Sequence, residues 1–494
     1  MLKLTKSVSN PGIARNAILN FLAMLFPLLL AILLIPTIVQ GLGVERFGIL
    51  ALIWGVFTYF SIMDFGLGRA LTHAVATRLN TRREDEIQSA LSHSLILISC
   101  LAVLLTLLGL AIAPSLVDRV LAIPRDYRDE TLISFQLLAG GLALVATSSA
   151  LNGYLAAFER FDLVNLVKVP LMAGTLCAPL LAIGNREPIL VSTALMVFLR
   201  VVAWITLIVM CRIATPPSIA GGQTRVAGFK ALLSFSGWIS LINLLNAVLT
   251  HADRWALAVW ASLATVTYYT VPFEVATKLW IIPSAVAAAM FPVFCRVSTH
   301  PSSLESERLL YFGTGFTMAI SFIATMVIAV FAGDILLVWL GEEFAKQSTS
   351  VFQILLIGTF INSIAHTAAT LLQAKGHPQW IAYLLLAELP LFCVALWICV
   401  PMLGALGAAL VWTGRVAVDA AALWYLARRC LARSAPTYPS LGIAFGAFLG
   451  TLIIGASIPS TIGKFFYCGF ALILFLAVFV RLNRHARSQI MSGI

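Results

Sequence analysis

The sequence has little charge for its length. Of its 494 residues, only 11% are Asp, Glu, Lys or Arg, whereas 60% are hydrophobic and the mean hydropathy is +0.97. Soluble globular proteins average about 25% charged residues, because a hydrated surface has to be covered. The composition therefore excludes a soluble multidomain protein and predicts an all-α protein that crosses a membrane many times.

Signatures of catalysis and of cofactor binding are also missing. The eight cysteines form no Cys-x-x-Cys pair, so neither a disulfide framework nor a zinc site is indicated. The phosphate-binding motif G-x-x-x-x-G-K-[ST] is absent, and His251 with Asp253 is weak evidence for a metal. The net charge of +11 comes from basic residues scattered between apolar runs. We therefore expect no enzyme activity, cofactor, metal site or nucleic-acid partner.

Fourteen apolar segments are long enough to cross a bilayer, since a transmembrane helix needs about 20 residues. We place them at residues 14–40, 47–70, 88–113, 131–156, 163–184, 188–211, 230–250, 256–293, 308–332, 350–373, 379–400, 403–427, 439–458 and 463–481. The eighth contains Pro272, Pro283 and Pro292, which can break a helix. No loop is long enough for a folded domain outside the membrane.

The basic residues predict the orientation of the chain. With the N-terminus inside, the inner segments carry a large excess of Lys and Arg, whereas the outer segments carry slightly more acids than bases. Cytoplasmic loops are enriched in Lys and Arg. Both termini are therefore expected to be cytoplasmic.

The two halves of the sequence resemble each other at an offset of 210 to 220 residues. The matched residues are Tyr59, Asp64, Arg69 and Leu71 with Tyr269, Glu274, Lys278 and Leu279, then Lys168 and Pro170 with Glu388 and Pro390, and Arg200 with Arg415. This offset spans six helices, so both halves enter the membrane in the same direction. The repeat predicts two parallel six-helix lobes, residues 1–212 and 213–433, with a site between them. Residues 434–494 add two helices and a basic tail.

Eight ionisable residues fall inside predicted spans, where each costs at least ~2.5 to 3.5 kcal/mol. Glu274 with Lys278, and Arg415 with Asp419, are one helical turn apart and are predicted to pair. Asp64 and Arg69 are five residues apart and need partners elsewhere. Arg200 lies mid-span with no acid within one turn, which favours a hydrated lumen or a bound anion. Glu388 is also alone in its span; it either carries a proton or sodium ion or pairs with an arginine.

A polar stripe runs along the segment 230–250. Ser236, Ser240, Asn243 and Thr250 share one helix face, and Asn16 with Asn20 forms a similar pair on the first span. Such groups either hold helices together or line a cavity that hydrogen-bonds a polar ligand.

Several stretches carry a resemblance to a known family. The sequence Gly41-Leu-Gly-Val-Glu-Arg-Phe-Gly48, then Tyr59 and Met63-Asp-Phe-Gly-Leu-Gly-Arg-Ala70, resembles the opening of bacterial polysaccharide transporters, the O-antigen and exopolysaccharide flippases. Leu371-Leu-Gln-Ala-Lys-Gly-His-Pro378 is also similar. These proteins belong to the multidrug/oligosaccharidyl-lipid/polysaccharide (MOP) exporter superfamily. The resemblance implies two six-helix lobes, alternating access and an inner-membrane flippase of polyprenyl-diphosphate-linked oligosaccharide.

That resemblance gives roles to the charged and polar residues. A diphosphate is bound by Arg or Lys, so Arg200, Arg415, Arg69 and Lys278 are candidates for the anionic headgroup. Asn20, Ser236, Ser240 and Asn243 are candidates for the cavity lining. Coupling to a proton or sodium gradient makes Asp64, Glu274, Glu388 and Asp419 candidate ion sites. Membrane lipid is an expected partner, together with a polysaccharide polymerase and a chain-length regulator.

Two other functions are weighed against the flippase. A drug or metabolite antiporter of the same superfamily is the nearest, although proton-coupled members resemble one another in carrying an Asp in the first helix, and no acid lies between Asn16 and Gln40. An integral-membrane enzyme of polysaccharide assembly is the other. Such enzymes usually carry a sizeable periplasmic loop, and none of that size is present.

Overall fold

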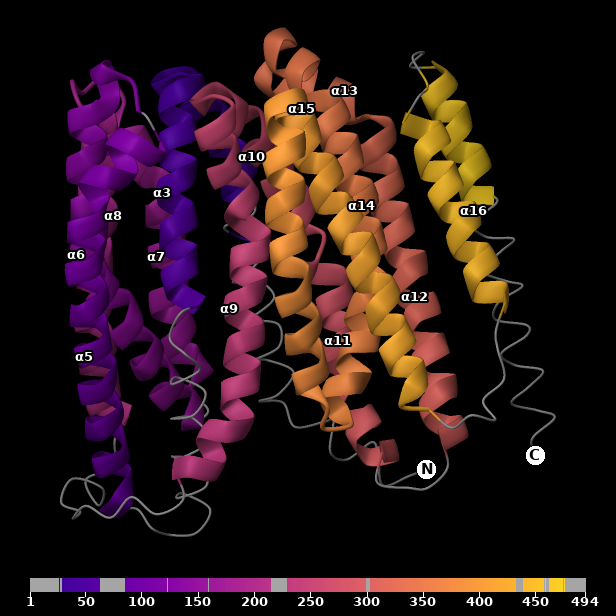
Figure 1. The fold of residues 1–494 in the computed structure, drawn as a ribbon, viewed down its shortest axis with the longest axis horizontal. Coiled ribbons are helices and arrows are strands. Elements are labelled where there is room, and N and C mark those ends of the chain that lie inside the picture. Colours follow the sequence, from indigo (N-terminus) through magenta and orange to yellow (C-terminus); the bar gives the residue numbers. More distant parts are fainter. Residues whose placement is uncertain are drawn as a thin grey trace. The chain divides into compact units, whose positions relative to one another are not determined.

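A computed structural model describes residues 26, 29–62, 85–121, 123–158, 160–214, 229–298, 303–431, 439–456, 458, 462–473 and 475. Within these residues, every regular element is a helix (Figure 1). The chain forms two compact units, Met1–His251 and Ala252–Ile494, which we call unit 1 and unit 2. The predicted all-α class is confirmed.

Unit 1 consists mainly of long helices. Its described helices are Leu29–Leu42, α3 (Val44–Ile62), α5 (Asp85–Ser115), a π-helical turn (Leu116–Val120), α6 (Arg125–Ala157), α7 (Phe161–Ala182), α8 (Pro188–Ala214) and most of α9 (Phe229–Trp260). Gly43 separates the first two with a φ of 81°, a conformation that favours glycine because it has no Cβ. This glycine belongs to the 41–48 motif, whose role here is to make a tight turn.

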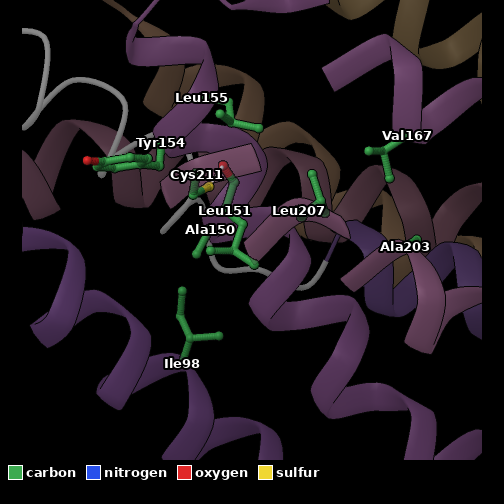
Figure 2. Packing of buried hydrophobic residues seen from close by; sticks show 9 residues of the cluster. All are labelled: Ile98, Ala150, Leu151, Tyr154, Leu155, Val167, Ala203, Leu207 and Cys211. Atoms are coloured by element: carbon green, nitrogen blue, oxygen red, sulfur yellow. Dashed lines mark hydrogen bonds between the residues drawn. The ribbon is translucent and has the colours of Figure 1, made fainter. Parts of the chain in front are cut away.

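The core of unit 1 forms where α6 packs against α5 and α8, and α7 against α8. Figure 2 shows its buried side chains, which are Ile98, Ala150, Leu151, Tyr154, Leu155, Val167, Ala203, Leu207 and Cys211. The Cys211 thiol also donates to the Leu151 carbonyl of α6 across 3.6 Å. These contacts fix α8 in unit 1 and thereby position Arg200, which lies one turn before Ala203.

Unit 2 is built around a central helix. Its elements are α10 (Leu263–Lys278), α11 (Ile281–Ser298), α12 (Ser303–Val330), α13 (Ala332–Leu340), α14 (Glu342–Ala374), α15 (Pro378–Arg429), α16 (Pro439–Ala456) and the helix Ile462–Ile473. α14 contacts α10, α11, α12, α13 and α15. Leu355, Phe360 and Ala368 of α14 are fully buried, so this helix supplies much of the core.

The predicted eighth span, residues 256–293, is divided in the structure. α9 continues to Trp260, and α10 starts after Ser262, whose hydroxyl accepts the Thr265 backbone N–H at 3.1 Å. α10 runs through Pro272, and the break comes at Leu279 and Trp280, between α10 and α11. Pro283 then occupies the first turn of α11, where a missing N–H costs little.

The predicted spans 379–400 and 403–427 form the two halves of α15, which meet at Gly404. This glycine has φ 55° and ψ −130°, outside the helical region. Glu388 and Arg415 are in contact, although 27 residues of continuous helix would separate them by about 40 Å. The two halves therefore fold back on each other as a hairpin.

The last helices dock onto unit 2 through aromatic rings and one ion pair. Phe322 of α12 stacks on Phe448 of α16, with centroids 4.4 Å apart, and on Phe475 at 6.2 Å. Lys464 Nζ lies 2.5 Å from a carboxylate oxygen of Asp334 on α13. The two added C-terminal helices thus belong to unit 2 rather than forming a separate body.

Many apolar side chains remain on the outside of both units. Leu181 and Phe198 of unit 1 are 70% and 61% exposed, and Leu391 of unit 2 is 71% exposed. Among the described residues, eight helical segments are long and apolar enough to cross a membrane. Such surfaces are stable only against lipid, so the chain is a multi-pass membrane protein.

Candidate functional site: a buried charged network in unit 2

Buried charges gather where α9, α10 and α15 approach one another in unit 2. Asp253 of α9 is fully buried. One of its oxygens accepts the Arg254 backbone N–H at 2.7 Å, and the other accepts the hydroxyl of Tyr269 on α10. Both donors compensate the loss of water around the carboxylate. Asp253 is thus held by two helices.

Arg254 links the same two helices. It is 2% exposed, and its Nη2 donates to Glu274 at 2.7 Å while its guanidinium lies 5.4 Å from the centroid of the Phe273 ring. The other Glu274 carboxylate oxygen accepts a hydrogen bond from Lys278 Nζ at 3.1 Å, which confirms the predicted Glu274–Lys278 pair. Asp253 and Arg254 fall between the predicted spans 230–250 and 256–293, but α9 extends to Trp260 and places both residues within a helix. The apolar run Trp255–Trp260 was the signal for that extension.

A second group of charges lies inside the α15 hairpin. Arg415 Nη1 is 3.4 Å from Glu388 Oε2, and the Arg415 guanidinium lies 5.6 Å from the Phe392 ring centroid. The predicted pairing of Arg415 with Asp419 is therefore replaced by a bridge to Glu388, because the hairpin brings the two halves of α15 together. The expectation that Glu388 pairs with an arginine is confirmed. Asp419 lies beside Glu388, within hydrogen-bonding reach.

The two groups form one network. α10 packs against α15, with the Phe273 and Trp412 ring centroids 5.3 Å apart, so Arg415 lies near the α9–α10 cluster. The network contains the cations Arg254, Lys278 and Arg415 and the acids Asp253, Glu274, Glu388 and Asp419. With every group ionised, it carries one excess negative charge.

Unit 1 has a different arrangement at the positions that the predicted repeat matches to Glu388 and Arg415. Arg200 is half-buried on α8, and Lys168 is exposed on α7. They match Arg415 and Glu388, so two cations stand where unit 2 has a base and an acid. The acids of unit 1 with assigned pairs lie near helix ends: Glu130 binds Arg46 at 3.2 Å, and Asp118 binds Arg128 at 2.7 Å.

The structure describes only some of the remaining predicted site residues. Asn20, Asp64 and Arg69 lie outside the described residues. Ser236, Ser240 and Asn243 lie on α9, and the Asn243 side chain is half-buried. Their role as a cavity lining stays a prediction. In the described part of the chain, no group of three or more His, Cys, Asp or Glu is arranged to hold a metal ion.

Lys375, from the 371–378 motif, has a structural contact. Its ammonium group donates to the Cys430 carbonyl at 2.7 Å, at the C-terminal end of α15. A cation is favourable there because the last carbonyls of a helix carry partial negative charge. Burial lowers the pKa of Lys375 below its ordinary value. The lysine thus ties the start of the hairpin to its end.

Comparison with known proteins gives sequence relatives and structural neighbours. A family model described as Polysaccharide biosynthesis protein matches residues 13–298. The chain is 28% identical over 421 residues to a Shigella flexneri protein assigned as an O-antigen transporter, covering 85% of this chain and 99% of that protein. It is also 30% identical over 128 residues to the uncharacterized membrane protein EpsK of Bacillus subtilis, 26% of this chain and 25% of that protein.

Solved transporters share the fold. An inward-facing multidrug resistance MATE family transporter of the MOP superfamily superposes with a TM-score of 0.67 at 15% identity, covering 84% of this chain and 93% of that one. A MOP superfamily transporter from Pyrococcus furiosus gives 0.62 at 17% identity, covering 85% and 95%. At these identities the likeness establishes the fold alone. The predicted MOP superfamily fold is confirmed.

Proposed function

This chain belongs to the polysaccharide biosynthesis protein family, and we propose that it is a flippase for polyprenyl-diphosphate-linked oligosaccharide. The oligosaccharide is an O-antigen or exopolysaccharide repeat unit. It moves from the cytoplasmic to the periplasmic leaflet of the bacterial inner membrane by alternating access, and both termini of the chain are cytoplasmic. The full-length relation to the Shigella protein carries the proposal, because the alignment includes 99% of that transporter.

The charge pattern supports an anionic substrate and narrows its binding residues. A lipid diphosphate carries negative charge, and Arg binds phosphate oxygens with two parallel hydrogen bonds. Arg415 and Lys278 are already bound to Glu388 and Glu274, so their charge is largely neutralised within unit 2. Arg200 lies near the middle of α8 (Pro188–Ala214), at a depth where a bound anion or water would stabilise its charge. We therefore assign the diphosphate to Arg200 and give the unit 2 cations a structural role.

Residues of two kinds are assigned to the rest of the substrate, the polar residues of α9 and the exposed apolar side chains. Sugars are recognised by amides and hydroxyls, which Ser236, Ser240 and Asn243 provide on α9. The polyprenyl tail stays in the bilayer, where the exposed apolar side chains of the protein contact lipid. Transport of an intact lipid-linked sugar breaks no covalent bond, so the chain needs no catalytic group. A polysaccharide polymerase and a chain-length regulator are the partners expected to use the translocated product.

A drug or metabolite antiporter is the second candidate. Its support is the fold shared with the multidrug resistance transporter and the buried acids of unit 2, which suit a cationic cargo or a coupling ion. The family match and the Shigella relative favour the flippase instead. A cationic substrate would also be repelled by Arg200 and Lys168, because both add positive charge to unit 1.

The proposal is tested by measuring leaflet exposure of polyprenyl-diphosphate oligosaccharide in proteoliposomes. The wild-type protein should move the lipid to the opposite leaflet, and Arg200→Ala should insert normally but abolish this movement. Arg212→Ala is the matched control, because Arg212 is an exposed arginine in the last turn of the same helix. Wild-type movement of a small cationic drug without movement of the lipid would favour the antiporter. Full lipid movement by Arg200→Ala would refute the role of Arg200.

A further inference from the structure

The start of α12 and the end of α15 lie at the same end of unit 2. α12 packs along α14, and Gln353 in the first third of α14 donates to the Ala329 carbonyl at the end of α12 across 3.3 Å. These two helices therefore run antiparallel. Lys375, directly after α14, donates to the Cys430 carbonyl at the end of α15. The first turns of α12 and the last turns of α15 are thus neighbours.

Two aromatic rings join these helices, and an arginine follows each ring. Tyr311 of α12 and Trp424 of α15 have ring centroids 5.6 Å apart. Arg308 lies three residues before Tyr311 and Arg428 lies four residues after Trp424, so each arginine shares a helix face with its ring. Both positions lie between the ring contact and the end of the bundle, about 4.5 and 6 Å of helix rise from the rings. The two arginines are therefore close to each other.

Arg429 adds a third cation to this end. Its guanidinium lies 4.7 Å from the centroid of the Tyr425 ring, which is one turn earlier on α15. Arg308, Arg428 and Arg429 all have exposed side chains, and in the described part of the chain none of the three forms a salt bridge. Glu307, the acid beside Arg308, is 2% exposed and so is withdrawn from the surface. We call the three arginines the basic patch.

The neighbouring rings place the basic patch at the level of lipid headgroups. Tyr and Trp are enriched where a membrane meets water, because each combines an apolar ring with a polar group. Tyr425 is 56% exposed, and Phe312 and Phe316 continue the exposed apolar surface along α12, with exposures of 60% and 41%. The arginines lie where this apolar surface ends, and their long side chains reach the phosphates of the adjoining lipids.

We propose that the basic patch binds the headgroup of an anionic phospholipid, which then bridges α12 and α15. A guanidinium bonds two phosphate oxygens at once. Anionic phospholipids present their phosphates at this level of a membrane and attract Lys and Arg near its surface. A zwitterionic phospholipid also brings an ammonium group, which three arginines repel. This inference does not depend on the proposed transport function.

Native mass spectrometry of the purified protein, titrated with phosphatidylglycerol or phosphatidylethanolamine, tests the basic patch. The wild type should bind phosphatidylglycerol more tightly. Arg428→Gln/Arg429→Gln should weaken this binding on the order of 25-fold, since each cation contributes about fivefold. Arg119→Gln/Arg125→Gln is the matched control, because it removes the same charge from exposed positions of unit 1, and it should bind like the wild type. Equal losses in the two double variants would overturn the site.

Further variants and competitors separate the site from a general charge effect. Arg308→Gln, on the other helix, should weaken phosphatidylglycerol binding about fivefold, and an unchanged affinity would contradict the bridge between α12 and α15. Phosphatidylglycerol should raise the thermal unfolding midpoint of the wild type but not of Arg428→Gln/Arg429→Gln, and an equal rise in both would contradict the patch. Tighter binding of inorganic phosphate or of a polyprenyl diphosphate at these arginines would overturn the phospholipid as the occupant.

Discussion

At positions matched by the repeat that the sequence predicts, unit 1 carries Lys168 and Arg200, whereas unit 2 carries Glu388 and Arg415. In unit 2 the acid and the base are bonded to each other, and the wider network is within one charge of neutrality. In unit 1 both positions are cationic. The two units therefore differ in electrostatics at these positions: an acid balances the arginine in unit 2, whereas both positions of unit 1 carry positive charge.

The largest expected effect comes from breaking the bridge inside unit 2. Arg415→Met leaves Glu388 and Asp419 buried without their cation, which should lower the stability of the protein by about 3 to 5 kcal/mol. The double variant Glu388→Gln/Arg415→Met removes both charges and should recover much of that loss. Thermal unfolding of the purified single and double variants measures the coupling. Equal stability of Arg415→Met and the wild type would contradict the bridge.

A smaller effect is expected from making unit 1 resemble unit 2. Lys168→Glu places an acid at the position that matches Glu388 and should offset the charge of Arg200. Because Lys168 is exposed, stability should change by no more than about 0.5 kcal/mol, while lipid movement in proteoliposomes should fall. Lys168→Gln is the control and should reduce movement less. Faster movement by Lys168→Glu would show that positive charge in unit 1 does not serve an anion.

The smallest effect concerns the added C-terminal helices. Lys464 and Asp334 form a bridge at which Asp334 is 41% exposed, so Lys464→Met should cost at most about 1 kcal/mol. Phe448→Ala should cost about 3 to 5 kcal/mol, because Phe448 is buried in the aromatic stack that holds α16. Thermal unfolding midpoints of the two variants show which substitution lowers stability more. A larger loss for Lys464→Met would show that the ion pair, rather than the rings, holds these helices.

Most of the fold could be predicted from the sequence, because crossing a membrane demands long apolar helices. The exceptions lie where charges or turns interrupt apolar runs. Asp253 and Arg254 look like loop residues in sequence, so the end of α9 was placed too early. The short helix α13 also fell in a predicted connection, since nine residues are too few for a spanning pattern.

The candidate site was only partly predictable. The Glu274–Lys278 pair follows from helical spacing, since residues four apart share a face. The Arg415–Glu388 bridge does not, because 27 residues separate the partners and only the hairpin at Gly404 brings them together. Tyr269 was visible only as a repeat match, and its bond to Asp253 depends on how α9 and α10 pack. Contacts between helices are thus the part that spacing alone misses.

The central claim is that Arg200 of unit 1, rather than the cations of unit 2, binds the diphosphate. Binding of polyprenyl-diphosphate oligosaccharide to the purified protein in nanodiscs tests this claim most directly. The comparison is between Arg200→Ala and the double variant Glu388→Gln/Arg415→Met. We predict that Arg200→Ala loses binding, whereas the double variant binds like the wild type, because its removed charges already neutralise each other. Retained binding by Arg200→Ala together with lost binding by the double variant would contradict the account.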